Sequence, residues 1–190
     1  LFRSLLNSNI FWMSQSQFFV CPQGGAPQPI PCSVWDFIFQ NMDPSQTDKV
    51  ICGTNSQFNE VNWFFPTRDD AEYAGQPNAY VCYNAQYQEW DVGYINRTAW
   101  YDQSLVGAPL ASDSNGWVYQ HDTSYNNAVG QSVEPINAWF KTGYFSLSNG
   151  QDLNFVDWMI PDFKWGQYNQ PDDADLQITF YVDRKSTRLN

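Results

Sequence analysis

Basic residues are scarce in this sequence. Nine Lys and Arg residues stand against twenty Asp and Glu residues, so the chain of 190 residues carries a formal net charge of -11. Binding along nucleic acid needs Lys and Arg to neutralise phosphates, so the scarcity argues against wrapping or sequence-specific recognition of DNA. Two interpretations of the acidity stay open. It keeps the protein in solution, or it forms the wall of a conduit that repels DNA and prevents sticking.

Histidine is also scarce, because His121 is the single one in the sequence. A Ser-His-Asp triad would have to use it, and no Gly-x-Ser-x-Gly elbow occurs anywhere. His121 follows the strand pattern of residues 117–120, and Asp122 beside it is expected on the other face of that strand. We therefore interpret His121 as a strand-end histidine with its hydrogen bonds satisfied.

Cysteine is present without the spacing that metal sites need. The sequence has no Cys-x-x-Cys pair, since the four cysteines lie far apart at Cys21, Cys32, Cys52 and Cys82. With one histidine besides, a zinc site is not expected. Buried free thiols are the preferred interpretation, and a Cys21–Cys32 disulfide across a hairpin is the alternative for a secreted protein.

The sequence gives no clear signal for a calcium site or for a membrane span. The segment QPDDADL offers carboxylates to calcium but matches no loop with defined ligand positions, so a solvated turn is expected at Asp172, Asp173 and Asp175. No apolar run approaches the length of a membrane span, and no signal peptide is visible. We expect no metal, no cofactor and no membrane partner.

Aromatic residues are abundant: nine Trp, fourteen Phe and eleven Tyr. Large flat side chains suit pleated sheets. In residues 59–100 the runs NEVNWFFPT, NAYVCYN and QEWDVGYINRTAW predict strands over residues 60–65, 79–83 and 90–95. Pro66 ends the first of them, because proline cannot donate to a central ladder. Three neighbouring strands in so short a stretch predict an antiparallel meander.

The rest of the chain repeats this pattern. Further strands are predicted over residues 10–13, 17–21, 50–54, 117–120, 136–147, 153–160 and 176–182, the last with strict period two. One short helix is predicted over residues 33–42, where Ser33 and Asp36 have the spacing of a capping box. Asp113, Asn115 and Gly116 form a tight-turn signal. The fold class is therefore all-β, built of meander hairpins with one short helix: a propeller, barrel or sandwich.

Carboxylates on aromatic strands leave a second kind of function open. Glycoside hydrolysis needs two carboxylates facing each other across a cleft, with aromatic rings to stack on the sugar. The candidates closest to aromatic strands are Asp36, Glu60, Glu89, Asp91 and Asp102. Acidic loop residues are expected in any acidic protein, so no catalytic residue is assigned. The sequon Asn96-Arg97-Thr98 is a short pattern that occurs by chance.

The ends of the sequence bear on domain organisation. The chain begins with Leu1, which is typical of a piece of a longer reading frame. Residues 1–184 are predicted to form a single all-β domain, a fragment of a longer chain of the propeller type. Residues 185–190, KSTRLN, are abruptly basic and polar, and we interpret them as a non-native tail.

A family resemblance covers nearly everything from residue 11 to residue 182. The segments WMSQSQFFV, PIPCSVWDFIF, KVICGTNSQFNEVNWFFPT, NAYVCYNAQYQEWDVGYINRTAW and NFVDWMIPDF, taken in order, resemble virion structural proteins of tailed bacteriophages. The similar proteins are of the β-propeller tail or head-to-tail connector type, including those that stabilise packaged DNA. In QHDTSYNNAVGQ the sequence departs from the family pattern, with Asp122 in place of a glutamate.

The resemblance implies a partial β-propeller without catalytic residues. It implies a noncatalytic virion component of the tail or head-to-tail region, made in the host cytoplasm, that assembles with other virion proteins as a homo-oligomer or ring around the DNA exit path. Trp12, Trp63, Trp90 and Trp100 would pack in the core or between blades. The competing hypothesis is a secreted propeller that binds carbohydrate or hydrolyses it.

Overall fold

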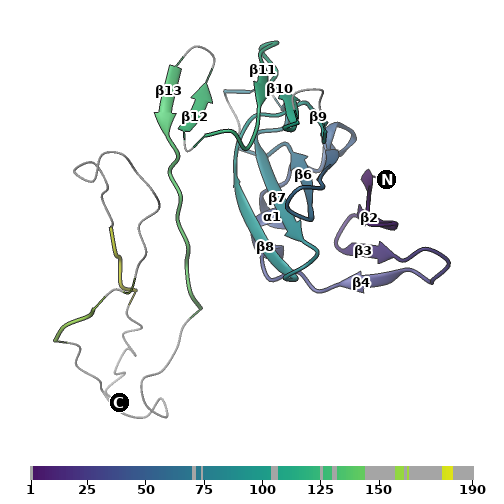
Figure 1. Ribbon diagram of the computed structural model, residues 1–190, viewed down its shortest axis with the longest axis horizontal. Coiled ribbons are helices and arrows are strands. Elements are labelled where there is room, and N and C mark those ends of the chain that lie inside the picture. The colour runs from purple at the N-terminus through teal and green to yellow at the C-terminus, as the bar shows by residue number, and fades with distance from the viewer. Residues whose placement is uncertain are drawn as a thin grey trace. The chain divides into compact units, whose positions relative to one another are not determined.

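The structure is a computed structural model that describes residues 2–69, 72–73, 75–103, 107–124, 126–129, 132–143, 157–160, 162 and 177–181. The chain divides into two compact units, Leu1–Trp139 and Phe140–Asn190. Every helix and strand of the described residues belongs to the first unit (Figure 1). The predicted all-β class, with antiparallel meander hairpins and one α-helix, is confirmed.

The first unit consists of consecutive antiparallel meanders. The first sheet contains β1 (Phe2–Leu6), β2 (Asn9–Met13), β3 (Phe18–Cys21) and β4 (Gln28–Ile30), in that order. The helix α1 (Trp35–Asn41) and the 3-10 turn η1 (Thr47–Lys49) lead to the second sheet. That sheet contains β5 (Ile51–Asn55), β6 (Glu60–Phe65), β7 (Ala79–Asn84) and β8 (Glu89–Tyr94).

Shorter strands follow. The third sheet contains β9 (Ala99–Tyr101), β10 (Leu110–Ser112) and β11 (Val118–Gln120), with β10 in the middle. The hairpin of β12 (Asn126–Val129) and β13 (Ser132–Pro135) completes the strands of this unit. β1 lies beside β5, and β5 lies beside β9, so the first strands of the three sheets are neighbours in sequence order. Each of these strands is also an edge of its own sheet.

The alternation of side chains along β6 gives the second sheet two different faces. Val61, Trp63 and Phe65 point to one face, and all three are fully buried. They meet the first sheet, whose Phe18 ring lies 4.8 Å from the Trp63 ring. Glu60, Asn62 and Phe64 point to the opposite face, because successive side chains of a strand alternate. The apolar face packs in the core. The opposite face, which we call the mixed face because it carries polar and aromatic side chains, is available to line a binding site.

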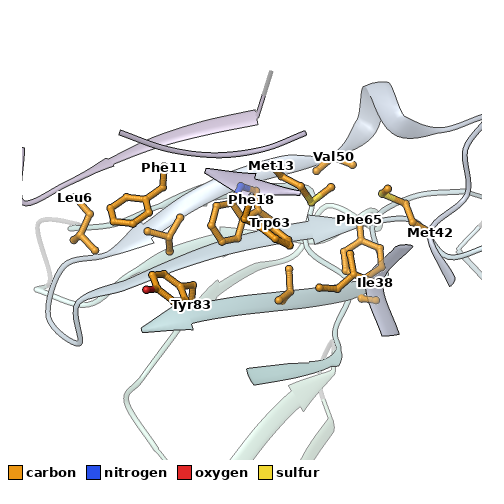
Figure 2. Packing of buried hydrophobic residues seen from close by; sticks show 13 residues of the cluster. Leu6, Phe11, Met13, Phe18, Ile38, Met42, Val50, Trp63, Phe65 and Tyr83 are labelled. Carbon is orange, nitrogen blue, oxygen red and sulfur yellow. The ribbon is translucent and has the colours of Figure 1, made fainter. Parts of the chain in front are cut away.

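The core lies between the first and second sheets, with α1 at one end (Figure 2). Phe18 is central, because its ring also lies 4.7 Å from the Trp90 ring. Trp90 is partly buried, and its Nε1–H donates to the carbonyl of Pro31 over 2.8 Å. The fully or largely buried members of the cluster come from β1, β2, β3, β6, β7, α1 and the segments beside them: Leu6, Phe11, Met13, Phe18, Ile38, Met42, Val50, Val61, Trp63, Phe65, Ala79, Val81 and Tyr83.

The helix differs from its prediction at its start. α1 begins at Trp35 with Val34 as N-cap, and no side chain caps it. The predicted capping box is therefore wrong. Ser33 lies one residue before the N-cap, and Asp36 instead accepts a hydrogen bond of 2.9 Å from Gln40, one turn further on. The predicted end is close, since Met42 leaves the helix in an extended conformation just before Asp43-Pro44.

The strands predicted near the end of the chain are not confirmed. Residues 177–181 lie in no strand, and Phe180 among them is 64% exposed, so the prediction of a half-buried strand is wrong for this stretch. A period-two pattern becomes a strand only beside a partner strand, and none of the described residues pairs with it. The described parts of the predicted strands 136–147 and 153–160 lie in no strand either, and residues 185–190 lie outside the described residues.

Candidate functional site

A polar pocket lies where the mixed face of the second sheet meets the third sheet. Its volume is about 260 Å³. We call it the acidic pocket, because three carboxylates line it and none of its described lining residues is Lys or Arg. It is lined by Asn55, Glu60, Asn62, Phe64, Tyr80, Cys82, Asp91, Ile95, Trp100, His121 and Asp122.

The strand register explains how the second sheet contributes to this pocket. Asn62 of β6 pairs with Cys82 of β7, which pairs in turn with Asp91 of β8. Paired residues of antiparallel strands point to the same face, so these three side chains form one row across the sheet. Glu60 lies two residues from Asn62 along β6 and therefore shares this face. Three consecutive strands thus bring separate polar residues together.

The carboxyl of Glu60 is perturbed by its surroundings. Partial burial raises its pKa, and the nearby charges of Asp122 and Asp91 raise it further. Hydrogen bonds with Cys82 and Asn84 lower the pKa in part, but the raising effects prevail. Two of the carboxylates named from the sequence, Glu60 and Asp91, therefore come together here, and Asp122 joins them from the end of the third sheet.

Asp122 is connected to the second sheet through Asn55. The Nδ2 of Asn55 donates a hydrogen bond of 2.8 Å to the Oδ2 of Asp122. Asn55 is 3% exposed, and its Oδ1 has no hydrogen-bond partner among the described residues. Asp122 has a φ of 58°, so the chain turns left-handed there. The prediction that Asp122 and His121 lie on opposite faces is therefore wrong, because this turn ends the alternation of β11 and both residues line the pocket.

His121 is a neutral hydrogen-bond acceptor. The Nε of Arg97 donates to the Nε2 of His121 over 2.8 Å. Desolvation, with a smaller contribution from the charge of Arg97, lowers the pKa of His121 to about 4. The prediction of a satisfied strand-end histidine is confirmed. Arg97 itself is 5% exposed, donates to the carbonyl of Asn96 and lies over the ring of Tyr119 at 4.1 Å.

Aromatic rings form the apolar part of the acidic pocket. Trp100 lies against Phe64 with ring centroids 5.5 Å apart, and its Nε1–H donates to the carbonyl of Thr54 over 2.7 Å. Phe64 in turn lies 6.2 Å from Tyr80. Gly53 permits this approach, because a Cβ atom there would overlap the Trp100 indole. Trp100 of β9 thus connects the third sheet to the second.

The other carboxylates named from the sequence lie elsewhere. Asp102 accepts hydrogen bonds from Thr54 and from Ser56 and lines a neighbouring open pocket of about 410 Å³. Glu89 is exposed on β8 and does not line the acidic pocket, and Asp36 is exposed on α1. Asp172, Asp173 and Asp175 lie outside the described residues.

The cysteines are free thiols. The predicted alternative, a Cys21–Cys32 disulfide, is not formed. Burial raises the pKa of the Cys52 thiol to about 12, and burial together with the charge of Glu60 raises that of Cys82 further. We therefore expect both thiols to stay protonated near neutral pH.

The Asn96 sequon and the Asp113 turn are structural. Asn96 is buried, donates to the carbonyl of Pro77 over 2.7 Å and accepts from the backbone of Ser114 over 2.7 Å. The carboxylate of Asp113 accepts from the backbone of Trp117 over 2.9 Å, and Gly116 has a φ of 87°, which confirms the predicted tight turn. The Asn96 amide thus connects this turn to the Pro77 carbonyl.

No protein-family model matches the chain, and no curated protein sequence matches it. In the described part of the chain, no three His, Cys, Asp or Glu side chains are arranged to hold a metal ion. None of the helices described here is long and apolar enough to cross a membrane.

Proposed function

We propose that the chain is a noncatalytic structural component of a tailed-phage virion, in the tail or the head-to-tail connector. In this proposal it assembles with other virion proteins, as a homo-oligomer or ring, around the DNA exit path. The observation that carries it is the repetition of meander sheets whose first strands, β1, β5 and β9, lie side by side.

Neighbouring first strands are the arrangement expected of successive propeller blades. Blades are antiparallel meander sheets around a central channel, so each innermost strand lies next to that of the following blade. The first and second sheets also pack face to face through aromatic side chains, as Phe18 and Trp63 do. This supports a partial β-propeller, and with it the family that the sequence resembles. The net charge of -11 suits a protein that DNA passes without sticking.

The test is the protein content of purified particles. Virions of the phage that encodes the chain are purified on a density gradient, and their peptides are quantified by mass spectrometry against the soluble lysate. The proposal expects peptides of residues 59–100 in the particles, in a fixed ratio to the portal protein. Peptides confined to the soluble fraction would overturn it.

The acidic pocket favours a second candidate, a propeller that binds or hydrolyses carbohydrate. Glu60 and Asp91 share this pocket with Trp100, and Glu60 has the raised pKa that a general acid needs. A glycan array and a hydrolysis screen separate the two functions. Hydrolysis that is lost in both Glu60→Gln and Asp91→Asn, and kept in Glu89→Gln, would establish the enzyme and exclude the noncatalytic role.

A further inference from the structure

The acidic pocket holds negative charge that its own lining leaves uncompensated. Glu60, Asp91 and Asp122 contribute carboxylates, and the described lining residues include no Lys or Arg. His121 adds no positive charge, because its Nε2 accepts the hydrogen bond from Arg97 and is therefore unprotonated. The guanidinium of Arg97 is occupied by His121, the Asn96 carbonyl and the Tyr119 ring. A bound cation would balance these charges.

A buried acceptor without a donor points in the same direction. Asn55 lines the pocket, is 3% exposed, and has an Oδ1 without a hydrogen-bond partner among the described residues. Its orientation follows from Asp122, since turning the amide would place its oxygen against the carboxylate in place of the 2.8 Å bond from Nδ2. An unsatisfied buried acceptor costs free energy, which a ligand carrying N–H groups would recover.

The walls of the pocket suit an organic cation. The rings of Phe64, Tyr80 and Trp100 line it, and aromatic faces attract ammonium groups. The volume of about 260 Å³ fits the end of an alkyl chain better than a whole drug-sized molecule. The described residues offer no three-ligand arrangement for a metal ion. Three carboxylates also favour a cation over a neutral sugar.

We infer that the acidic pocket between the second and third sheets binds a primary alkylammonium group, presented by a free amine or by a lysyl side chain. The ammonium donates to the carboxylates of Asp91 and Asp122 and to the Oδ1 of Asn55. The alkyl stem lies along Trp100 and Phe64. This inference is independent of the virion proposal, because it concerns one pocket and its ligand chemistry.

The test is a titration of the full chain, labelled with ¹⁵N, with n-butylammonium chloride at constant ionic strength. The indole N–H resonance of Trp100, assigned with the variant Trp100→Phe, reports on the pocket wall. The inference expects a saturable shift of this resonance with butylammonium and none with 1-butanol, which has a similar chain without the charge. An equal shift with 1-butanol, or no shift with butylammonium, would overturn it.

A matched pair of variants isolates the charge of the pocket. Asp91 and Glu89 are both exposed residues on β8, two positions apart, and Asp91 alone lines the pocket. Asp91→Asn is expected to weaken butylammonium binding about fivefold or more, and Glu89→Gln to change it less than about twofold. Equal weakening of butylammonium binding in both variants would show that overall charge causes the effect. That result would overturn the proposed site.

Two further ligands are compared with butylammonium. One tests whether the ammonium belongs to a lysyl side chain or to a free amine, and the other tests whether the pocket prefers a neutral sugar. Tighter binding of Nα-acetyl-lysine N-methylamide than of butylammonium supports a lysyl side chain of a partner, and equal or weaker binding supports a free amine. Glucose is the neutral control. A shift of the Trp100 resonance by glucose that exceeds the butylammonium shift would overturn the inference and favour the carbohydrate function.

Discussion

Trp63 is the residue on which the core depends most. It is fully buried, and its ring lies 4.8 Å from Phe18 and 6.3 Å from Trp90. Trp63→Ala is expected to lower the free energy of unfolding by about 3 to 5 kcal/mol, through lost contacts and the remaining cavity. Urea unfolding followed by tryptophan fluorescence measures this. Tyr87→Ala, at a 66% exposed position, is the control with little expected change. Equal midpoints for both variants would contradict the core described here.

Trp90 is only partly buried, so the stability cost of removing its side chain can be compared with that of Trp63. It contacts Phe18 and Tyr83, with the Tyr83 ring at 4.6 Å, and donates to the Pro31 carbonyl. Because part of its ring already meets solvent, Trp90→Ala is expected to cost less than Trp63→Ala, about 2 to 3 kcal/mol. The same urea series gives the order of the two variants. A larger loss for Trp90→Ala would mean that the first and second sheets separate when it is removed.

His121 makes the folded state sensitive to acid. Its pKa is lowered to about 4 in the folded state, while the unfolded value is 6.5. The unfolded chain therefore takes up this proton more readily, and stability present above pH 6.5 is lost as the pH falls toward 4, by about 3 kcal/mol at most. His121→Gln keeps an acceptor for Arg97 and removes the titration. The difference in unfolding free energy between wild type and variant should change over this pH range. A constant difference would contradict the lowered pKa of His121.

Glu60 changes stability with pH in the direction opposite to His121. Its raised pKa means that the folded state favours the protonated carboxyl, so its contribution to stability is lost as the pH rises through that pKa. Glu60→Gln removes the repulsion from Asp91 and Asp122. The variant is expected to unfold at a higher urea concentration than wild type at pH 8, with a smaller difference at pH 4. A variant less stable than wild type at pH 8 would show that the carboxylate is compensated.

At the scale of elements, the contact between the second and third sheets depends on a glycine. A Cβ atom on Gly53 of β5 would overlap the Trp100 indole of β9. Gly53→Ala is expected to destabilise the chain by about 1 to 3 kcal/mol, because the third sheet must shift to relieve the overlap. Gly143→Ala is the matched control, since nothing lies within 4 Å of its added methyl group. The indole N–H resonance of Trp100 should move in the first variant and stay in the second.

Elements with a strong local signal were predictable, and short ones were not. β6 matches its predicted residues 60–65, because an aromatic and β-branched run ends at Pro66. β9 and β10 have three residues each, too few for alternation to show. Their pairing arises from contact with β5 and from the turn at Asp113. The predicted capping box failed because spacing alone does not show which backbone group a side chain meets.

The acidic pocket was predictable only in part. Glu60 and Asp91 stood out in the sequence as carboxylates on aromatic strands. Their proximity depends on the register of β6, β7 and β8, which places residues about thirty positions apart on one face. Asn55 gave no signal, because an asparagine at a strand end is ordinary in sequence. Asp122 was placed on the wrong face, since its left-handed conformation is set by the fold.

Across the whole first unit, one kind of structure repeats, the antiparallel meander sheet. The first two sheets are four-stranded meanders in sequence order, and a third follows with three strands. Aromatic contacts join the first sheet to the second, and Trp100 joins the second to the third. Stacked meander sheets of this kind suit the structural role that we propose for the chain in a virion.

Immunogold labelling of intact particles tests the proposal that this chain is built into a tailed-phage virion. Antibodies are raised against the folded chain and applied to gradient-purified virions of a phage whose genome carries the coding sequence. If the chain is a virion component, gold is expected at the tail or the head-to-tail junction, with no label on particles of an unrelated phage. Unlabelled particles, with the same antibodies detecting the chain in the soluble lysate, would contradict it.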